Sequence, residues 1–255
     1  MKKLLIPFLI IILLSQLIHS NNLNWKIGDY WKYEVTMWRF YPSGGHPQGF
    51  MKAIMEYKVS GKENVTFHGK SYYTYKVEGK ICVSNHTQNF TEFYRVNDSS
   101  YIGGHPWYRG GSLIYEPPIE RFKFLEVGKK WNQSITEFFN NSFGVQNATL
   151  FLYYECIGKE NVKTKAGDFE CYIIREMYGN NSYSYYLYYF SPEVKNIVLS
   201  KYYLNGTIGE KMELIFTSYL KNSLIEMIFI TLIILSALFL TIYCFWQKFN
   251  IKTKK

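Results

Sequence analysis

The sequence predicts a mainly β protein: two related antiparallel β-sheet modules, half-barrel or sandwich-like, followed by one transmembrane helix. Three observations predict this fold class. Runs rich in Tyr, Val, Ile, Thr and Phe are broken by Gly, Asn and Lys, which is typical of strands and turns. The pentapeptide GKENV occurs at 61–65 and again at 158–162. An apolar run without a charge lies near the C-terminus, at 227–246.

The first 20 residues predict a secretory signal peptide. Two lysines precede an apolar run over 4–14, and the small residue Ser20 ends the polar stretch that follows. Ile18 and His19 fit a cleavage site poorly, so an uncleaved anchor is the alternative. In either case we expect the chain after this segment to be exported.

A second apolar segment predicts a transmembrane helix over 223–247. Its 20 uncharged residues at 227–246 would rise about 30 Å as a helix, which matches the hydrocarbon core of a bilayer. The basic tail, 248–255, would stay cytoplasmic. A buried core helix is the alternative. The expected location is therefore the cell membrane, as a single-pass type I protein with its N-terminal ectodomain outside.

The net charge of +9 is concentrated at the ends of the chain. The expected exported part, 21–223, holds 23 basic and 19 acidic residues and carries a charge of only +4. No basic stripe indicates nucleic acid as a partner. The expected partners are the membrane, through one span, and an envelope protein or a lipid ligand.

Nine Asn-x-Ser/Thr sequons favour an exported glycoprotein. Chance in an Asn-rich chain is the alternative. The candidate glycosylation sites are Asn64, Asn85, Asn89, Asn97, Asn132, Asn140, Asn147, Asn180 and Asn205.

Three cysteines lie in the expected exported part: Cys82, Cys156 and Cys171. A disulfide between Cys156 and Cys171 is the preferred pairing, because these residues flank a predicted strand–turn–strand. Three free buried thiols are the equal alternative. The spacing is not that of a zinc site, and we expect neither a metal nor another cofactor.

The two GKENV copies lie within a longer similarity at an offset near 100 residues. Upstream of each copy is a Gly-x-x-Trp pattern, at Gly28–Trp31 and Gly128–Trp131. This repeat predicts an internal duplication, with β module 1 at 21–120 and β module 2 at 121–222. GKENV itself is interpreted as a structural corner between strands.

Ten segments are predicted to be strands from their composition and spacing. They are 29–40, 50–60, 71–83, 88–97, 131–139, 148–158, 169–178, 182–191, 195–204 and 208–219.

Three segments of the second module carry a resemblance to known proteins. They are VGKKW (127–131), KENVKTKAGDFECYII (159–174) and YYFSPEVKNIV (188–198). Together they resemble LolA-like and related lipoprotein-type half-barrels of exported prokaryotic proteins. The resemblance implies a curved antiparallel sheet that can hold an apolar ligand, and it transfers no catalytic residue. The Asn, Lys, Ile and Tyr bias resembles that of archaeal membrane-anchored surface proteins.

The motif GGHP occurs twice, at 44–47 and at 103–106. Each copy follows an aromatic strand, and in a meander the two loops would reach the same sheet edge. They would form a ligand-binding rim, with two flexible turns as the alternative. The rim residues are His46, His105, Trp107, Tyr108 and Arg109.

The sequence contains none of the common motifs for nucleophilic, phosphate-binding or metalloprotease sites. We therefore expect no catalytic residue and no enzyme. The predicted function is a non-enzymatic, membrane-anchored cell-surface protein with a structural or ligand- or partner-binding ectodomain. The alternative is a carrier or sensor of an apolar, lipid-like ligand, and a metal-assisted hydrolase is less favoured.

Overall fold

The structure is a computed structural model that describes residues 24–38, 49–67, 69–106, 110–179, 183–219, 228 and 231–238. Its described residues form twelve strands. These are β1 (Tyr30–Trp38), β2 (Phe50–Phe67), β3 (Lys70–Val83), β4 (His86–Arg95), β5 (Tyr101–His105), β6 (Ser112–Ile119), β7 (Lys130–Asn141), β8 (Gly144–Thr164), β9 (Gly167–Tyr178), β10 (Ser184–Ser191), β11 (Asn196–Leu204) and β12 (Thr207–Thr217).

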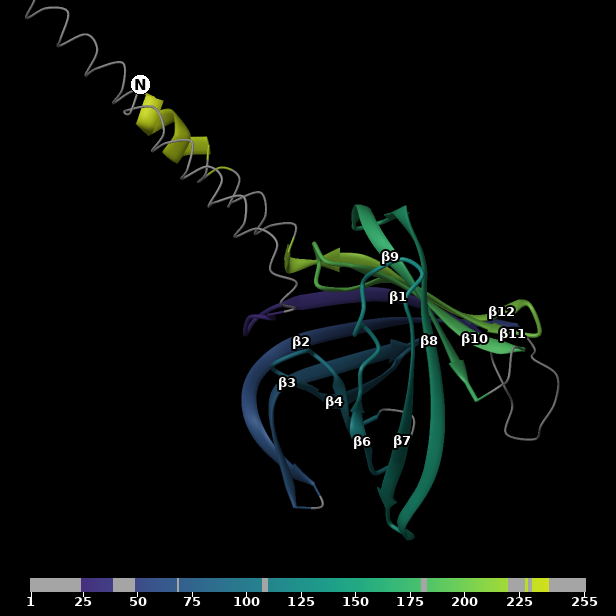
Figure 1. Cartoon of the computed structure of the whole chain (residues 1–255). Helices are drawn as coiled ribbons and strands as arrows, with labels where there is room; N and C mark the ends of the chain where they lie inside the picture. The colour runs from purple at the N-terminus through teal and green to yellow at the C-terminus, as the bar shows by residue number, and fades with distance from the viewer. Residues whose placement is uncertain are drawn as a thin grey trace, which may run out of the picture.

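The strands form one closed antiparallel barrel, in which each strand pairs with its neighbours in the sequence (Figure 1). β1 closes the barrel by pairing with β12, for example through Val35 and Met212. β6 pairs with β7 in the middle of the chain. The predicted pair of half-barrel or sandwich modules is therefore wrong. The edges that two open sheets would expose are hydrogen-bonded to each other, which removes unpaired edge strands.

All ten predicted strand segments overlap observed strands, whereas β5 and β6 were not predicted. Both contain residues that are depleted in strands: Gly103 and Gly104 in β5, and Pro117 and Pro118 in β6.

The two halves of the barrel repeat the same local structure at the GKENV segments. The strand register shifts between Val59 and Gly61 in β2, and between Cys156 and Gly158 in β8. The amide of Gly28 donates to Val59 O at 2.8 Å, and that of Gly128 donates to Cys156 O at 2.8 Å. GKENV thus follows an irregularity of the kind that bends a strand, inside two long strands that continue through it.

Beyond these irregularities, each long hairpin reaches the outer face of other strands. The Tyr72 hydroxyl in β3 donates to Glu116 in β6 at 2.5 Å. The Lys165 ammonium, in the turn between β8 and β9, donates to Glu34 in β1 at 2.7 Å. Figure 1 shows β2 and β3 curving together. The repeated segments therefore shape the barrel wall.

One end of the barrel, the closed end, is filled by aromatic side chains from the start of β1 and the preceding segment. Trp25 and Trp31 pack with their ring centroids 5.2 Å apart. Their indole N–H groups donate to Lys195 O at 2.8 Å and Val194 O at 3.0 Å. Burying these rings with their polar atoms paired stabilises this end.

The prediction of a transmembrane helix over 223–247 is wrong. In the part of the chain that the structure describes, no helix is long and apolar enough to cross a membrane. The predicted single-pass type I location and the predicted membrane partner depend on this helix, so they are wrong as well. Of the predicted span, residues 228 and 231–238 are described, as helix. The rest of the span, the signal peptide over 1–20 and the tail over 248–255 lie outside the described residues.

Candidate functional site

The opposite end of the barrel, the open end, is formed where odd-numbered strands finish and even-numbered strands begin. Inward-facing residues become steadily more exposed towards it. Along β4, Phe90 is buried whereas the inward-facing Gln88 and His86 are exposed. Along β9, Glu176 is buried and Tyr178 is 41% exposed. The interior is therefore filled near the closed end and accessible at the open end.

A pocket of about 640 Å³ lies at the open end, against β2, β3 and β4. Met51, Ile81 and Val83 supply apolar surface, and the polar groups come from strand ends and the turn at Ser84. Such a volume and such a mixture are typical of small-molecule sites. Its lining residues are Phe50, Met51, Lys52, Ile81, Val83, Ser84, His86 and Gln88.

A buried ion pair lies inside the barrel. Arg121, from the segment between β6 and β7, donates through Nε to Glu176 Oε2 at 2.9 Å. Its guanidinium lies 4.5 Å from the centre of the Tyr188 ring, and the Tyr188 hydroxyl donates to Glu176 Oε1 at 3.3 Å. Burial alone would lower the pKa of Arg121, but the Glu176 charge raises it well above its usual value. Arg121 therefore stays charged.

A further carboxylate, Glu92 in β4, faces inward opposite Val77. Burial raises the pKa of Glu92, against the lowering effects of the Tyr94 hydrogen bond and the Arg121 charge. The Tyr94 hydroxyl donates to Glu92 Oε2 at 2.5 Å. The barrel interior thus holds acidic groups that are only partly compensated by positive charge.

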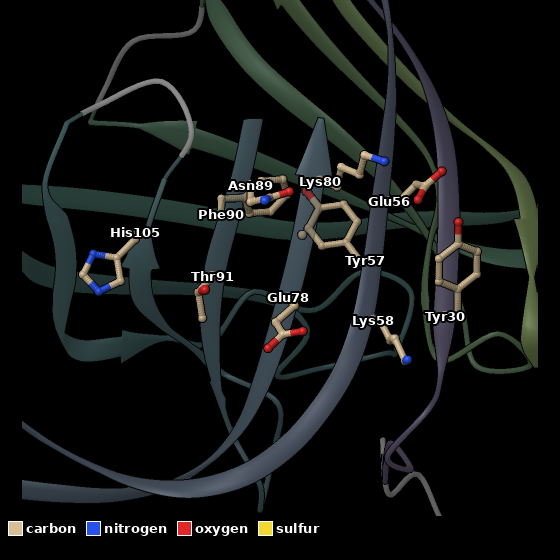
Figure 2. A pocket seen from close by; sticks show the side chains of 11 residues that line it. Tyr30, Glu56, Tyr57, Lys58, Glu78, Lys80, Asn89, Phe90, Thr91 and His105 are labelled. Atoms are coloured by element: carbon tan, nitrogen blue, oxygen red, sulfur yellow. The ribbon is translucent and has the colours of Figure 1, made fainter. Parts of the chain in front are cut away.

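A second pocket, the outer groove, also measures about 640 Å³ and crosses the outer face of β1 to β5 (Figure 2). One cross-strand row of outward-facing residues runs along it: Tyr30, Lys58, Glu78, Thr91 and His105. Figure 2 shows Tyr30 at one end of this row and His105 at the other.

The charges of the outer groove are balanced, and part of them is engaged. Two carboxylates and two ammonium groups line it: Glu56, Glu78, Lys58 and Lys80. Glu56 lies 2.9 Å from the Lys32 ammonium, and the hydrogen bond from Lys32 lowers its pKa. Burial, followed by the Glu56 charge, raises the pKa of Tyr30 to about 12. The groove therefore offers less unmatched charge than the barrel interior.

Of the predicted ligand-binding rim, the structure describes His105 alone. Its ring is exposed at the end of β5, with Nδ1 3.4 Å from Gly111 O. The topology places the β1–β2 and β5–β6 connections at the same end of the barrel. His46, Trp107, Tyr108 and Arg109 lie outside the described residues, so the rim stays a prediction.

The second GGHP motif has a packing explanation in β5. A Cβ atom at Gly103 would lie 2.0 Å from Leu113 O, and one at Gly104 would lie 1.9 Å from Thr91 O. The backbones of the neighbouring strands lie so close here that there is no room for a Cβ atom. The glycines are therefore required for the β4–β5–β6 pairing.

The cysteines of the described part are free thiols, so the predicted Cys156–Cys171 disulfide is absent. Cys156 pairs with Ile174 and Cys171 with Glu160, which offsets the two thiols along the β8–β9 ladder.

No group of three or more His, Cys, Asp or Glu residues within the described ranges could hold a metal ion. Eight sequon asparagines are exposed, and Asn180 lies outside the described residues.

Sequence reasoning missed the inward-facing charged residues Arg121, Glu176, Glu92 and Glu210. A signal was present, since Glu176 lies in the mainly apolar segment CYIIREMY of β9, in which Arg175 is the other charged residue. Its alternation places Glu176 on the same face as Ile174. A carboxylate on a buried face requires a partner, which could have directed attention to Arg121.

No family model matches the chain. No curated protein matches it either. Three solved structures are similar in fold. A protein described as exported, with a YmcC-like fold, from Bacteroides fragilis shares 12% identity over 76% of this chain and 96% of its own, with a TM-score of 0.45. A protein described as a lipoprotein from Parabacteroides distasonis shares 14% identity over 76% and 96%, with a TM-score of 0.38.

The third structure is the hypothetical lipoprotein YmcC from Escherichia coli, at 9% identity over 72% of this chain and 83% of its own, with a TM-score of 0.35. The chain is thus similar to bacterial β proteins that are described as exported or as lipoproteins. The resemblance to LolA-like half-barrels and the archaeal origin are not confirmed by these comparisons.

Proposed function

We propose that this protein is a non-enzymatic binding protein that accepts a small amphipathic ligand at the open end of its barrel. The observation that carries the proposal is the exposure of inward-facing side chains at that end. At the open end, His86 and Gln88 are exposed on the same face as the buried Phe90. A barrel interior accessible at one end is a common place for small-molecule sites.

The size and lining of the pocket support a compact ligand. The open-end pocket of about 640 Å³ has apolar walls at Met51, Ile81 and Val83 and a polar margin at His86 and Gln88. Nearer the closed end, a cavity between Trp25, Trp31 and Tyr33 measures only about 60 Å³. This small cavity could not hold an acyl chain, so the ligand is expected to stay in the open half.

The proposal is tested by filling the pocket. The full chain is titrated with the neutral amphipathic dye N-phenyl-1-naphthylamine, whose fluorescence rises in apolar sites. Val83→Trp places a large side chain at the pocket wall and is expected to weaken dye binding about tenfold or more, because it occupies the volume the dye needs. Thermal unfolding confirms that each variant is folded.

Val145→Trp is the matched control, since Val145 is 61% exposed and does not line the open-end pocket. It should leave the affinity for the dye unchanged. If the wild-type chain does not bind the dye, or if Val83→Trp and Val145→Trp bind it equally well, the proposed site is wrong.

A further inference from the structure

A single row of inward-facing residues crosses seven neighbouring strands and reaches the open-end pocket at Met51. Directly paired residues of antiparallel strands point to the same face, so the whole row faces the barrel interior. From β8 through β12 and β1 to β2, the row consists of Tyr154, Glu176, Tyr186, Tyr202, Glu210, Met37 and Met51.

One part of this row already holds a cation. The Arg121 guanidinium pairs with Glu176 and lies over the ring of Tyr188 at 4.5 Å. Tyr188 is the next inward-facing residue after Tyr186 on β10, and the two rings are parallel within 2°. A carboxylate and tyrosine faces thus combine to stabilise a positive charge away from water.

Further along the row, a second carboxylate lies beside tyrosine rings, but the described residues place no cation there. Glu210 is partly exposed and makes no hydrogen bond or ion pair with any residue in the described part of the chain. Tyr186 and Tyr202 lie beside it, with ring centroids 4.7 Å apart. The register pairs Glu210 with Tyr202 and Tyr202 with Tyr186, and the Glu210 charge adds to burial in raising the pKa of Tyr186.

Keeping the Glu210 carboxylate ionised in its present surroundings also costs free energy. Burial raises the pKa of Glu210, and no cation among the described residues offsets the effect. The strand register shifts between Tyr202 and Tyr203, beside Gly209. Irregularities of this kind re-aim side chains next to functional sites. Glu210 thus lies next to a strand irregularity, and the described part of the barrel wall supplies it with no counter-ion.

We propose that Glu210, Tyr186 and Tyr202 bind an organic cation, an ammonium or guanidinium group carried on an apolar body. This inference rests on the proposed function, because the apolar body would lie along Met37 and Met51 towards the open-end pocket. A charge-assisted hydrogen bond to Glu210 and contact with the tyrosine faces would hold the cation, as Glu176 and Tyr188 hold Arg121.

The test compares a cation with a neutral molecule of the same chain length. The full chain is titrated by calorimetry with n-octylammonium and, separately, with n-octanol. Wild type is expected to bind n-octylammonium about tenfold more tightly, as one charge-assisted hydrogen bond implies. Glu210→Gln removes the charge and keeps the shape, so it should remove this tenfold preference and leave the affinity for n-octanol unchanged.

Matched controls lie on the opposite face of the same strands. Glu213→Gln changes an outward carboxylate of β12 that pairs with Lys211 at 2.6 Å, and it should retain the preference. Tyr186→Leu and Tyr202→Leu should each weaken n-octylammonium binding several-fold. Tyr185→Leu and Tyr203→Leu, which alter a stacked pair 4.8 Å apart on the outer face, should not.

The outcomes separate the two proposals. Equal binding of n-octylammonium and n-octanol by wild type would overturn the cation site and leave the proposed function standing. An equal loss in Glu210→Gln and Glu213→Gln would also overturn it, since the effect would then be one of overall charge. Failure of wild type to bind either molecule would overturn the cation site together with the amphipathic-ligand function.

Discussion

The Arg121 Nε atom lies 2.9 Å from Glu176 Oε2 in the interior of the barrel. Glu176 is fully buried in β9, and Arg121 comes from a connection at the closed end. The pair therefore ties that connection to the strand wall. Buried ion pairs gain little over apolar replacements, yet the loss of one partner is costly because a charge is left buried alone.

Arg121→Met is expected to lower the free energy of unfolding by about 3–5 kcal/mol, because the Glu176 carboxylate would lose its cation. Urea unfolding measures this loss. The double variant Arg121→Met/Glu176→Met should recover most of it, since it removes both charges. Lys32→Met, which breaks the surface pair with Glu56, should cost no more than about 1 kcal/mol. Equal losses for Arg121→Met and Lys32→Met would contradict the assignment.

Glu92→Gln is expected to change how stability depends on pH. Burial raises the pKa of Glu92 in the folded state, despite the Tyr94 hydrogen bond and the Arg121 charge that face it. For a raised pKa, the stabilisation is fully present below the unfolded-state pKa and is lost as pH rises through the folded-state pKa. Wild type should therefore lose stability relative to Glu92→Gln as pH rises.

Urea unfolding between about pH 4 and pH 8 follows this difference. Glu78→Gln, on the exposed outer face of β3, is the control and should run parallel to wild type. A constant difference between wild type and Glu92→Gln at every pH would show that Glu92 titrates normally.

The local structure was largely predictable from the sequence, whereas the closure of the barrel was not. Tyr, Val and Ile runs located ten of the strands, because side-chain composition acts locally. The pairing of β6 with β7 and of β1 with β12 depends on which edges meet in space. Offsets near 100 residues indicated repetition, but a repeat can form two domains or two halves of one barrel.

The interior charges were hidden for a related reason. Glu176 and Glu210 lie in one cross-strand row, yet they are 34 positions apart in the sequence. Only the register of β9 to β12 brings them onto a common face. The GGHP motif predicted a ligand-binding rim, whereas the close packing of β5 against its neighbouring strands explains Gly103 and Gly104.

Cysteine reactivity provides a test of the free thiols. Burial raises the pKa of Cys171 to about 12 and also raises that of Cys156, and both side chains are fully buried. Since the thiolate is the reactive form, native chain should be alkylated at Cys82 well before Cys156 or Cys171. A short iodoacetamide pulse with peptide mass mapping measures the order. A disulfide-linked peptide joining Cys156 and Cys171 would contradict the structure.

Gly104→Ala is expected to destabilise the barrel by about 3 kcal/mol or more, because its Cβ would lie 1.9 Å from Thr91 O and force β4 and β5 apart. Gly61→Ala is the matched control: Gly61 has no atom within 4 Å of an added Cβ and does not have a positive φ. Its substitution should stabilise the chain by about 0.4–1 kcal/mol, by restricting the unfolded state. Urea unfolding distinguishes the two signs. If Gly104→Ala were tolerated as well as Gly61→Ala, the strands at β5 could not be as close as the barrel requires, and the GGHP glycines would need another explanation.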